Sequence, residues 1–315
     1  MKVLVTGAAG FIGSNLAIRL LQEGHSVVGL DNLSAGTREN VDSRVEFHRR
    51  DIRERELADL FRGVDTVFHL AAKNCLSDCL QNPIETSDIN VTGTANILEH
   101  ARRANVRKFI YADTSAEYEG ISDFPSTVEK IAPRGPYAVS KRGGALFCES
   151  FRQMFGMNIT AVRYFNVYGP AQDWRRVVPP VMSAFIIKLL QGTPPVIYGT
   201  GEKRRDFIYV DDVNDFHLLA MNDDRTNGKT YNVGSGVNYS ILEIYTMIEQ
   251  KLGTGIRPVF KEDLPGEAQI TLADISQEKA LGWSPQTDIR SGLEKSVRYI
   301  RERVLQKPAA VGQQP

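Results

Sequence analysis

Residues 1–20 are Met1-Lys-Val-Leu-Val-Thr-Gly-Ala-Ala-Gly-Phe-Ile-Gly-Ser-Asn-Leu-Ala-Ile-Arg-Leu20, and their pattern indicates the class of fold. The apolar residues 3–5 are typical of a short parallel strand that is covered on both faces. A helix is indicated by apolar side chains at helical spacing: Leu16, Ala17, Leu20 and Leu21. The strand and the helix are joined by three glycines: Gly7, Gly10 and Gly13. Because glycine accepts a positive φ and lets other groups approach the backbone, the turn is a candidate cradle for a pyrophosphate at the helix N-terminus.

The spacing of this turn is G-x-x-G-x-x-G, one residue wider than the commoner dinucleotide fingerprint. By itself it also fits a tight strand-to-helix turn without a ligand. Asp31 follows a second apolar strand, residues 26–30, about twenty positions past the glycines, where an adenosine ribose would offer its hydroxyls. A carboxylate there favours NAD over NADP, because it would repel a 2′-phosphate. The alternative is that Asp31 caps the segment that follows it.

The charge balance, the apolar runs and the cysteines of the chain indicate what class of protein it is. The chain has 315 residues, and 38 Lys plus Arg balance 38 Asp plus Glu, so it lacks the basic excess of a nucleic-acid binder. No apolar run approaches the roughly eighteen residues of a membrane span, and no signal-peptide pattern precedes the first strand, so we expect a soluble cytoplasmic protein. The three cysteines, Cys75, Cys79 and Cys148, are expected to be reduced thiols. Cys75 and Cys79 lie four apart, but packing is favoured over a metal site.

Strands and helices then alternate without a hairpin signal. We expect strands at 45–48, 66–70 and 106–112, and helices at 57–61 and 90–104. This order predicts an α/β fold with a doubly wound parallel sheet, whose ligands bind at the carboxyl ends of the strands. Two groups of predicted cofactor contacts lie at such ends. Asp51 and Ile52 would lie beside the adenine, and Leu70 leads into Ala71 and Ala72, whose small side chains allow the cofactor to approach closely.

The fifth strand delivers residues 113–120, Asp-Thr-Ser-Ala-Glu-Tyr-Glu-Gly, to the same edge. Tyr137 and Lys141 follow on the next helix, four residues apart and therefore on one face. A lysine ammonium beside a phenol stabilises the phenolate, so the tyrosine could act as a general base. Taken without its context, the same spacing is common in solvent-exposed pairs.

Taken together, these motifs resemble the extended short-chain dehydrogenase/reductases, and specifically the nucleotide-sugar epimerase/dehydratase family. The resemblance covers nearly the whole chain. The matching segments are Thr6-Gly-Ala-Ala-Gly-Phe-Ile-Gly13, Asp31-Asn-Leu33, His69-Leu-Ala-Ala72, Pro136-Tyr-Ala-Val-Ser-Lys141, Arg163-Tyr-Phe-Asn-Val-Tyr-Gly-Pro170 and Arg205-Asp-Phe-Ile-Tyr-Val-Asp-Asp212.

The resemblance implies a Rossmann domain, residues 1–166 plus 207–232, and a smaller nucleotide-sugar lobe, residues 167–206 plus 233–307, with a flexible tail at 308–315. In the second part we expect helices at 181–190, 213–221, 241–252 and 289–304, and strands at 196–201 and 231–236. The implied cofactor is NAD, and the implied NAD contacts are Gly7, Gly10, Phe11, Ile12, Gly13, Asp31, Asn32, Ser34, Asp51, Ile52, Leu70, Ala71, Ala72, Tyr137, Lys141 and Tyr164.

By the same resemblance, Tyr137 removes the proton from the sugar 4-hydroxyl, while Lys141 bonds the nicotinamide ribose and lowers the pKa of the tyrosine. Thr114 orients the 4-oxygen. Substrate contacts are Asn166 and Arg205 at the diphosphate and Tyr198 at the nucleobase. Asn166 could instead satisfy backbone groups in a turn, and Arg205 could pair with Asp206 or Asp211. The family's further arginine is missing near Gln269, where Arg175, Arg176 or Lys203 could compensate.

The reaction depends on the residues after Thr114. Dehydratases of this family carry an Asp-Glu pair there, whereas this chain has Ser115 and Ala116, which favours a 4-epimerase acting through a 4-keto intermediate on UDP-glucose/UDP-galactose or their N-acetyl forms. Alternatives are a dehydratase or UDP-glucuronate decarboxylase that uses Glu117, a UDP-glucuronate 4-epimerase, and a non-catalytic dinucleotide-binding protein. Glu117 and Glu119 could also be solvated loop acids. The resemblance further implies a homodimer formed through the helices 90–104 and 140–154.

Overall fold

A parallel sheet of seven strands forms the centre of the protein, in the order β10-β6-β5-β4-β1-β2-β3. The computed structural model describes residues 1–172, 179–263 and 268–304. The strands of this sheet are β1 (Lys2–Thr6), β2 (Ser26–Asp31), β3 (Glu46–Arg49), β4 (Thr66–His69), β5 (Lys108–Thr114), β6 (Ile159–Tyr164) and β10 (Thr230–Val233). All its strand pairs are parallel, which confirms the predicted doubly wound α/β fold.

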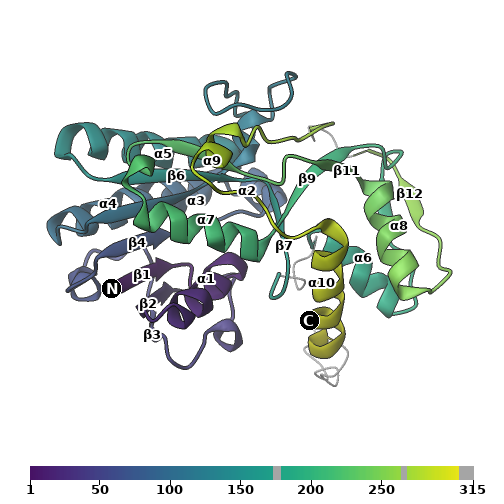
Figure 1. Ribbon diagram of the computed structural model, residues 1–315, viewed down its shortest axis with the longest axis horizontal. Coiled ribbons are helices and arrows are strands. Elements are labelled where there is room, and N and C mark those ends of the chain that lie inside the picture. The colour runs from purple at the N-terminus through teal and green to yellow at the C-terminus, as the bar shows by residue number, and fades with distance from the viewer. Residues whose placement is uncertain (173–178, 264–267, 305–315) are drawn as a thin grey trace.

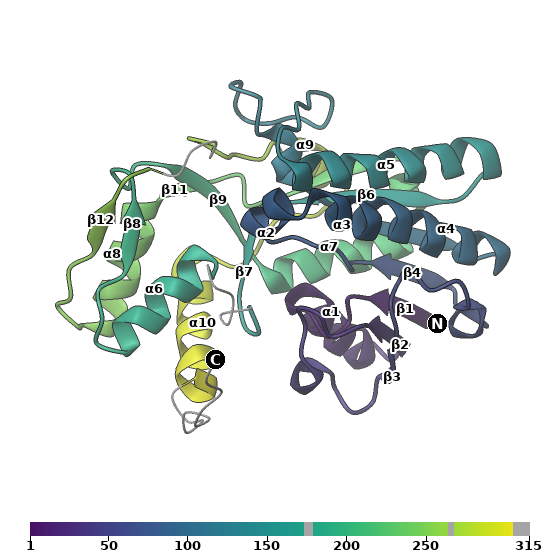
Figure 2. The same cartoon turned by 180° about the vertical axis from the view of Figure 1, so that it is seen from behind.

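Helices cover both faces of the sheet (Figures 1 and 2). One layer contains α1 (Phe11–Gln22) and α7 (Val210–Asn222), and the other contains α4 (Thr94–Arg103) and α5 (Pro136–Phe155). The side chains of β1 alternate between the two cores: Val3 and Val5 pack with α1 and α7, whereas Leu4 packs with α4 and α5. This alternation explains why residues 3–5 are apolar without interruption.

Several helix ends follow local sequence signals. Pro136 opens α5, where its missing N–H costs no hydrogen bond, and Gly156 ends that helix at a φ of 67°. Helix α8 (Ile241–Leu252) begins with a capping box, in which the Ser240 and Glu243 side chains each accept the other residue's backbone N–H. The predicted bounds of α8, and of α6 (Val181–Leu190) and α10 (Ile289–Val304), agree with the structure.

A smaller unit lies beside the carboxyl ends of the strands (Figure 1). It contains a three-stranded sheet, β11-β9-β7, a two-stranded sheet, β12-β8, and the helices α6, α8 and α10 packed around one core. Its strands are β7 (Asn166–Tyr168), β8 (Val196–Tyr198), β9 (Arg204–Tyr209), β11 (Asn238–Ser240) and β12 (Val259–Lys261). Short helix α9 (Ser276–Ala280) instead packs against β10 of the large sheet.

Some elements differ from the sequence-based expectation. The helix expected at 90–104 starts earlier, because the π-helix η3 (Asp88–Gly93) leads into α4. Two short helices, α2 (Leu76–Gln81) and α3 (Pro83–Ser87), precede it and were not expected. The remaining turns of helix are η1 (Arg38–Asn40), η2 (Ala58–Phe61), η4 (Ser115–Tyr118) and η5 (Asp224–Thr226). The expected tail, 308–315, lies outside the described residues.

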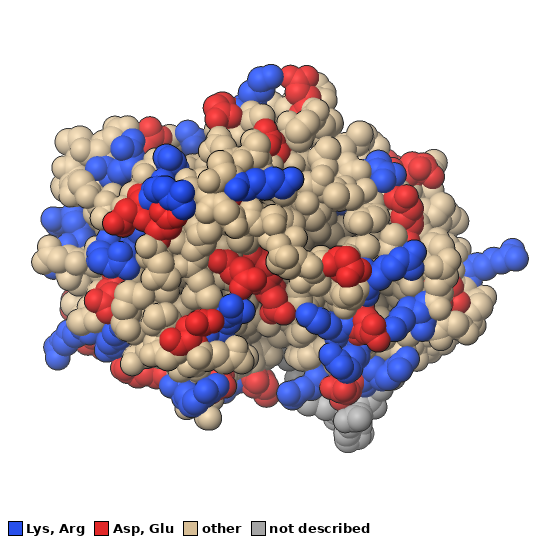
Figure 3. All heavy atoms as spheres, in the orientation of Figure 1, with Lys and Arg blue, Asp and Glu red and all other residues tan. Residues whose placement is uncertain are grey.

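The surface carries both signs of charge. Lysines and arginines alternate with acids over the face seen in Figure 3, so no basic stripe crosses that face. Of the helices that the structure describes, none is long and apolar enough to pass through a membrane.

Candidate functional site

The glycine turn lies between β1 and α1, at the point where the strand order of the large sheet reverses. Gly7 has a φ of 72°, and a Cβ there would lie 2.9 Å from the Ala71 nitrogen. A Cβ on Gly13 would lie 2.1 Å from the Gly7 carbonyl oxygen. Gly10 is the N-cap of α1 and has no side chain that could accept a backbone N–H of the first turn. The turn therefore needs its glycines for its own shape, and it presents a helix N-terminus suited to a diphosphate.

The two residues that open α1 have apolar surroundings. Phe11 packs against the core of the smaller unit, and Ile12 packs against the α1–α7 core. Both were predicted as cofactor contacts, and their backbone amides belong to the first turn of α1.

Asp31, at the end of β2, is bound to the glycine turn. Its carboxylate accepts the amide N–H groups of Ala9 at 3.0 Å and Leu33 at 2.7 Å. Burial raises the pKa of this carboxyl. Asp31 therefore caps the segment that follows it, which was the alternative to a ribose contact. The carboxylate still has enough lone pairs to accept a further hydroxyl.

The predicted adenine edge is a network of side chains after β2 and β3. Asn32 donates to the Asp51 carboxylate at 2.9 Å and accepts the Ser34 amide at 3.0 Å. Arg53 also binds Asp51, which holds the pKa of that carboxyl well below its usual range. Ile52 is buried in the α4–α5 core. The structure thus brings Asn32, Ser34 and Asp51 together beside the glycine turn.

Residues 70–72, after β4, are fixed by a buried threonine. The Thr6 hydroxyl accepts the amides of Leu70 and Ala71, both at 3.1 Å. His69 lies between the hydroxyls of Thr6, at 2.8 Å, and Thr94, at 3.0 Å. Burial lowers the pKa of His69 to about 3, so this imidazole is neutral and holds two strand ends and a helix together.

Tyr137 and Lys141 lie in the first turns of α5. The Lys141 side chain is 3% exposed, and its Nζ lies 4.1 Å from the centre of the Tyr111 ring. The Tyr111 hydroxyl in turn donates to the Lys141 carbonyl at 2.8 Å. Burial lowers the pKa of Lys141 to about 8, which still leaves the ammonium protonated near pH 7. The aromatic face therefore holds a cation on the helix face that carries Tyr137, which is half-buried.

Two hydroxyls follow one another at the end of β5. Thr114 is 8% exposed, and its hydroxyl accepts the Ala116 amide at 3.1 Å, which caps η4. Ser115, the first residue of η4, is more exposed. The sequence directed attention to Thr114 alone, whereas the structure places a second and more accessible hydroxyl beside it.

Glu117 is fully buried in an ion-pair cluster. Its carboxylate lies 2.7 Å from the guanidinium of Arg163, whose Nε also donates to Asp113 at 3.0 Å. The same guanidinium donates to the Tyr118 hydroxyl at 3.0 Å and to the Val128 carbonyl at 2.9 Å. Burial and then the charge of Asp113 raise the pKa of Glu117 to about 7. Glu117 is thus not a solvated loop acid, and the sequence did not reveal Arg163 as its partner.

The predicted substrate contacts lie on the smaller unit. The Asn166 amide, on β7, donates to the Asp206 carbonyl at 2.8 Å, and Arg205, on the neighbouring β9, donates to the Arg204 carbonyl at 3.0 Å. The Asp206 carboxylate accepts three backbone amides, those of Ser235, Gly236 and Ala273.

Tyr198 is 36% exposed on β8, in the two-stranded sheet. Tyr164, on β6, is bonded through its hydroxyl to the His217 ring at 2.6 Å. Of the residues considered as substitutes for the missing arginine, Lys203 pairs with Asp263, and Arg175 and Arg176 lie outside the described residues.

All three cysteines are free thiols, and Cys79 and Cys148 are buried. Burial raises the pKa of both buried thiols. Within residues 1–172, 179–263 and 268–304, no group of three His, Cys, Asp or Glu side chains could hold a metal ion.

Comparisons with known proteins agree on one family. Residues 3–234 match the family described as "NAD dependent epimerase/dehydratase family". The UDP-glucose 4-epimerase of Mycolicibacterium smegmatis is 35% identical over 313 residues, which cover 96% of this chain and 99% of that protein.

Solved structures are similar over the same length. The UDP-glucose 4-epimerase of Thermotoga maritima with UDP-glucose superposes with a TM-score of 0.93 at 32% identity, covering 96% of this chain and 100% of the other. The UDP-glucuronic acid 4-epimerase of Bacillus cereus, in complex with UDP-glucuronic acid and NAD, gives a TM-score of 0.90 at 33% identity, covering 96% and 99%.

Proposed function

The chain belongs to the NAD dependent epimerase/dehydratase family, whose cofactor is NAD, and on that basis we propose that it is a nucleotide-sugar 4-epimerase. One observation carries the proposal. Lys141 holds a buried ammonium against the Tyr111 ring, on the helix face that carries Tyr137, in a helix that contacts both β5 and η4. A phenol supported in this way is suited to exchange a proton with a sugar hydroxyl.

NAD fits the cradle that the glycines form. The diphosphate would lie over the turn at the N-terminus of α1, because Gly10, the N-cap, has no side chain to accept the first backbone N–H groups of the helix. Asp31 would accept the adenosine ribose hydroxyls, and residues 51–52 and 70–72 would flank the adenine and the nicotinamide sides. When bound, NAD supplies a hydride acceptor and donor for carbon 4 of the sugar.

In the proposed reaction Tyr137 takes the proton of the sugar 4-hydroxyl and later returns it. The Lys141 ammonium stabilises the phenolate electrostatically and bonds the nicotinamide ribose. Thr114 orients the 4-oxygen, and Ser115 is the second hydroxyl available for that contact. Asn166 and Arg205 would hold the diphosphate of the substrate, with Tyr198 near its base.

The position of Glu117 supports epimerisation over the alternatives. A dehydratase or a decarboxylase needs an acid or base beside the sugar, and Glu117 is fully buried against Arg163 instead. Ser115 and Ala116, the positions that precede it, carry no titrating group. We therefore keep elimination and decarboxylation as outcomes of the test rather than as the proposed activity.

The substrate class follows from the relatives. Similar proteins are named as epimerases of UDP-glucose and of UDP-glucuronate, so we propose a UDP-sugar. UDP-glucose and UDP-galactose, or their N-acetyl forms, remain the first choice, and UDP-glucuronate is the second.

The test is an NMR assay of the anomeric protons. The purified protein is incubated with UDP-glucose, UDP-N-acetylglucosamine or UDP-glucuronate, and the proposal expects the 4-epimer of at least one. Tyr137→Phe should abolish turnover while NAD stays bound. Tyr231→Phe, which loses only a long 3.5 Å bond to the Arg225 carbonyl, is the matched control. A 4-keto-6-deoxy or pentose product, or no turnover of any sugar, would overturn the proposal.

The same NMR assay shows which hydroxyl, that of Thr114 or that of Ser115, contacts the sugar 4-oxygen. If Thr114 orients the 4-oxygen, Thr114→Val lowers turnover strongly and Ser115→Ala has little effect. The reverse result assigns the contact to Ser115 and leaves Thr114 only its role as the cap of η4.

We also propose a homodimer. Large apolar side chains on α5 are exposed: Val139, Leu146, Phe147, Met154 and Phe155. Most recur at intervals of seven or eight residues and so share one helix face, which is a suitable surface for a second copy.

Two further proposals concern organisation and location. We propose that residues 1–166 plus 207–232 form the NAD-binding part, against which α9 also packs. We propose that residues 167–206 plus 233–307 form the nucleotide-sugar part, with Asn166 at the boundary contacting the substrate diphosphate. We propose a cytoplasmic location, because three free thiols suit a reducing compartment.

A further inference from the structure

A buried carboxylate lies on the same face of β5 as the ring that holds Lys141. Tyr111 belongs to the core between the large sheet and the α4–α5 layer, and Asp113 is two residues further along the strand, so its side chain points to the same layer. The Lys141 Nζ lies 4.1 Å from the centre of the Tyr111 ring. Asp113 is thus attached to the strand about 7 Å beyond the ring over which the ammonium lies.

Asp113 and Glu117 share one guanidinium. Both carboxylates are fully buried, and they lie 3.0 Å and 2.7 Å from the side-chain nitrogens of Arg163. The second oxygen of Asp113, Oδ1, is buried and has no hydrogen-bond donor among the described residues. A buried carboxylate is costly unless a cation balances it, and two carboxylates exceed the single charge of Arg163. The cluster is therefore negative when both acids are ionised, and the same layer offers Lys141 as a second cation.

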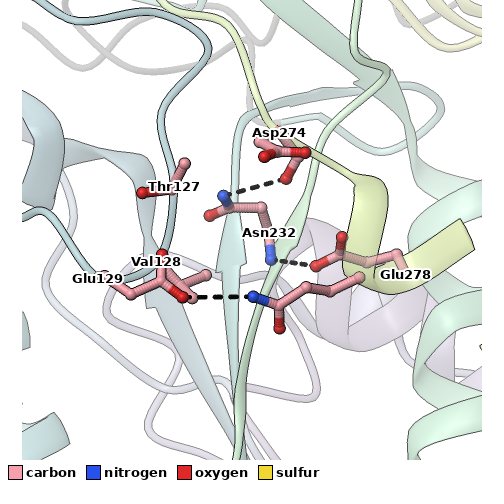
Figure 4. A pocket seen from close by; sticks show the side chains of 7 residues that line it. Thr127, Val128, Glu129, Asn232, Asp274 and Glu278 are labelled. Atoms are coloured by element: carbon pink, nitrogen blue, oxygen red, sulfur yellow. Dashed lines mark hydrogen bonds between the residues drawn. The ribbon is translucent and has the colours of Figure 1, made fainter. Parts of the chain in front are cut away.

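Hydrogen bonds fix the cluster in this position. Arg163 donates to the Tyr118 hydroxyl and to the Val128 carbonyl. The Tyr118 hydroxyl in turn donates to the Asn232 side chain at 2.6 Å. Figure 4 shows Val128 and Asn232 on two segments, the loop before α5 and strand β10, that line one pocket. Arg163 is therefore held by segments besides its own strand, and it keeps the Asp113 carboxylate in place.

Other charges near Lys141 are neutralised or paired. Burial raises the pKa of the phenols and the thiol around it, lowers the pKa of the imidazole and so keeps these groups neutral: Tyr111 on β5, Tyr164 on β6, Cys148 on α5 and His69 on β4. The acids on α2, α3, η3 and α4 have basic partners: Asp78 and Glu85 with Lys73, Asp88 with Arg53, and Glu99 with Arg102 and Arg103.

The ends of η4 and α5 add few further charges. Glu119, after η4, accepts the Gly135 amide before α5, and Arg142, on α5, is a cation that acts on Glu117. Tyr137, on the same helix, is the proposed general base. Burial lowers the pKa of Lys141, and the charges of Asp113 and Glu117 act in the opposite direction.

We propose that Asp113 is a positioning residue whose buried carboxylate keeps the Lys141 side chain charged and in place over the Tyr111 ring. Glu117 adds to this effect as it ionises near pH 7. The inference rests on the proposed function, in which the ammonium stabilises the Tyr137 phenolate.

The first experiment measures the charge of Lys141 without turnover. Lysines of the full chain are labelled with carbon-13 at Cε, the Lys141 signal is identified by its absence from Lys141→Met, and its chemical shift is followed by NMR against pH. Asp113→Asn keeps the size of the side chain and an oxygen that can accept from Arg163. It should lower the titration midpoint of Lys141 by at least one pH unit, a tenfold loss of proton affinity.

A matched variant shows whether the effect is specific. Asp212→Asn, at a buried acid on α7 in the opposite layer of helices, should leave the Lys141 midpoint unchanged. If Asp113→Asn does not fold, the combined variant Asp113→Asn, Glu117→Gln and Arg163→Met removes the net negative charge of the cluster and should also lower the midpoint. An unchanged midpoint in the folded variant, or an equal decrease in Asp212→Asn, would overturn the inference.

The second experiment is the pH profile of kcat in the epimerase assay. Because Asp113→Asn loses the ammonium at a lower pH, the ratio of its kcat to that of the wild type should fall at least fivefold between pH 6 and pH 8.5. A purely structural effect would lower kcat by the same factor at each pH and would count against the inference. A wild-type chain that epimerises no sugar would refute the proposed function alone, because the lysine titration does not use turnover.

Discussion

Removal of the Arg163 guanidinium is expected to destabilise the protein strongly. Its side chain is 3% exposed and contacts two carboxylates that are themselves fully buried, Asp113 and Glu117. It also donates hydrogen bonds to Tyr118 and Val128. Arg163→Met keeps much of the volume but leaves a buried carboxylate without its counter-ion.

The expected cost is about 3–5 kcal/mol, the usual result when one partner of a buried ion pair is removed. At about 2 °C per kcal/mol for a chain of this size, the melting temperature should fall by about 6–10 °C. The assay is urea denaturation followed by circular dichroism, with the free energy of unfolding taken by linear extrapolation.

Two further variants test whether the loss of stability comes from the unpaired buried charge. Arg44→Met removes an exposed arginine that pairs with Asp42, and should change stability by less than about 1 kcal/mol. Adding Asp113→Asn and Glu117→Gln to Arg163→Met removes the unpaired charge and should recover part of the loss. The reasoning is refuted if Arg163→Met lies within about 1 kcal/mol of wild type, or if the triple variant is no more stable than the single one.

Gly13→Ala places a Cβ 2.1 Å from a carbonyl oxygen, so it should lower the free energy of unfolding and abolish NAD binding. The control, Gly24→Ala, meets only a φ of 81° and open space, and its expected cost of roughly 1 kcal/mol should be smaller. Equal effects of the two variants in denaturation and in NAD titration would contradict this prediction. Burial raises the pKa of Glu278 from 4.5 to about 7, so the folded chain keeps a proton that the unfolded chain releases. Wild-type stability relative to Glu278→Gln should therefore fall by up to about 3 kcal/mol as pH rises from 4.5 to 7, and a difference that does not vary with pH in urea titrations would disprove it. Leu146→Asp should convert the proposed dimer to a monomer in analytical ultracentrifugation, whereas Val259→Asp, at an exposed residue of β12, should not; a monomeric wild type would end the dimer proposal.

The large sheet and its glycine turn could be predicted from the sequence because their signals are local. Residues 3–5 and the glycines after them lie within a few positions of one another, and each has a steric reason to be there. The bounds of α6, α8 and α10 followed from apolar spacing and from local caps, such as the Ser240 box.

The short strands of the smaller unit could not be predicted in the same way. Strand β12, residues 259–261, is exposed throughout and is defined by pairing with β8, more than fifty positions earlier in the chain. An exposed strand of three residues has neither alternation nor length to identify it, so long-range pairing decides its existence.

The same distinction between local signals and long-range pairing applies to the residues of the candidate site. Tyr137 and Lys141 could be proposed from the sequence because their spacing places them on one helix face. The environment of Glu117 was not found, because it depends on the register of β5 with β6, which sets Asp113 opposite Arg163. The more exposed Ser115 hydroxyl was also undervalued, since exposure depends on how η4 folds over the strand end.

The path of the chain between its two parts has a practical consequence. The chain leaves the large sheet after β6, returns for α7 and β10, leaves again for β11 and α8, and comes back once more to place α9 on β10 before α10. No single peptide bond therefore divides the larger unit from the smaller one. A protease that cuts one surface loop should yield a nicked particle that still migrates as one species in gel filtration, and the fragments should separate only under denaturing conditions.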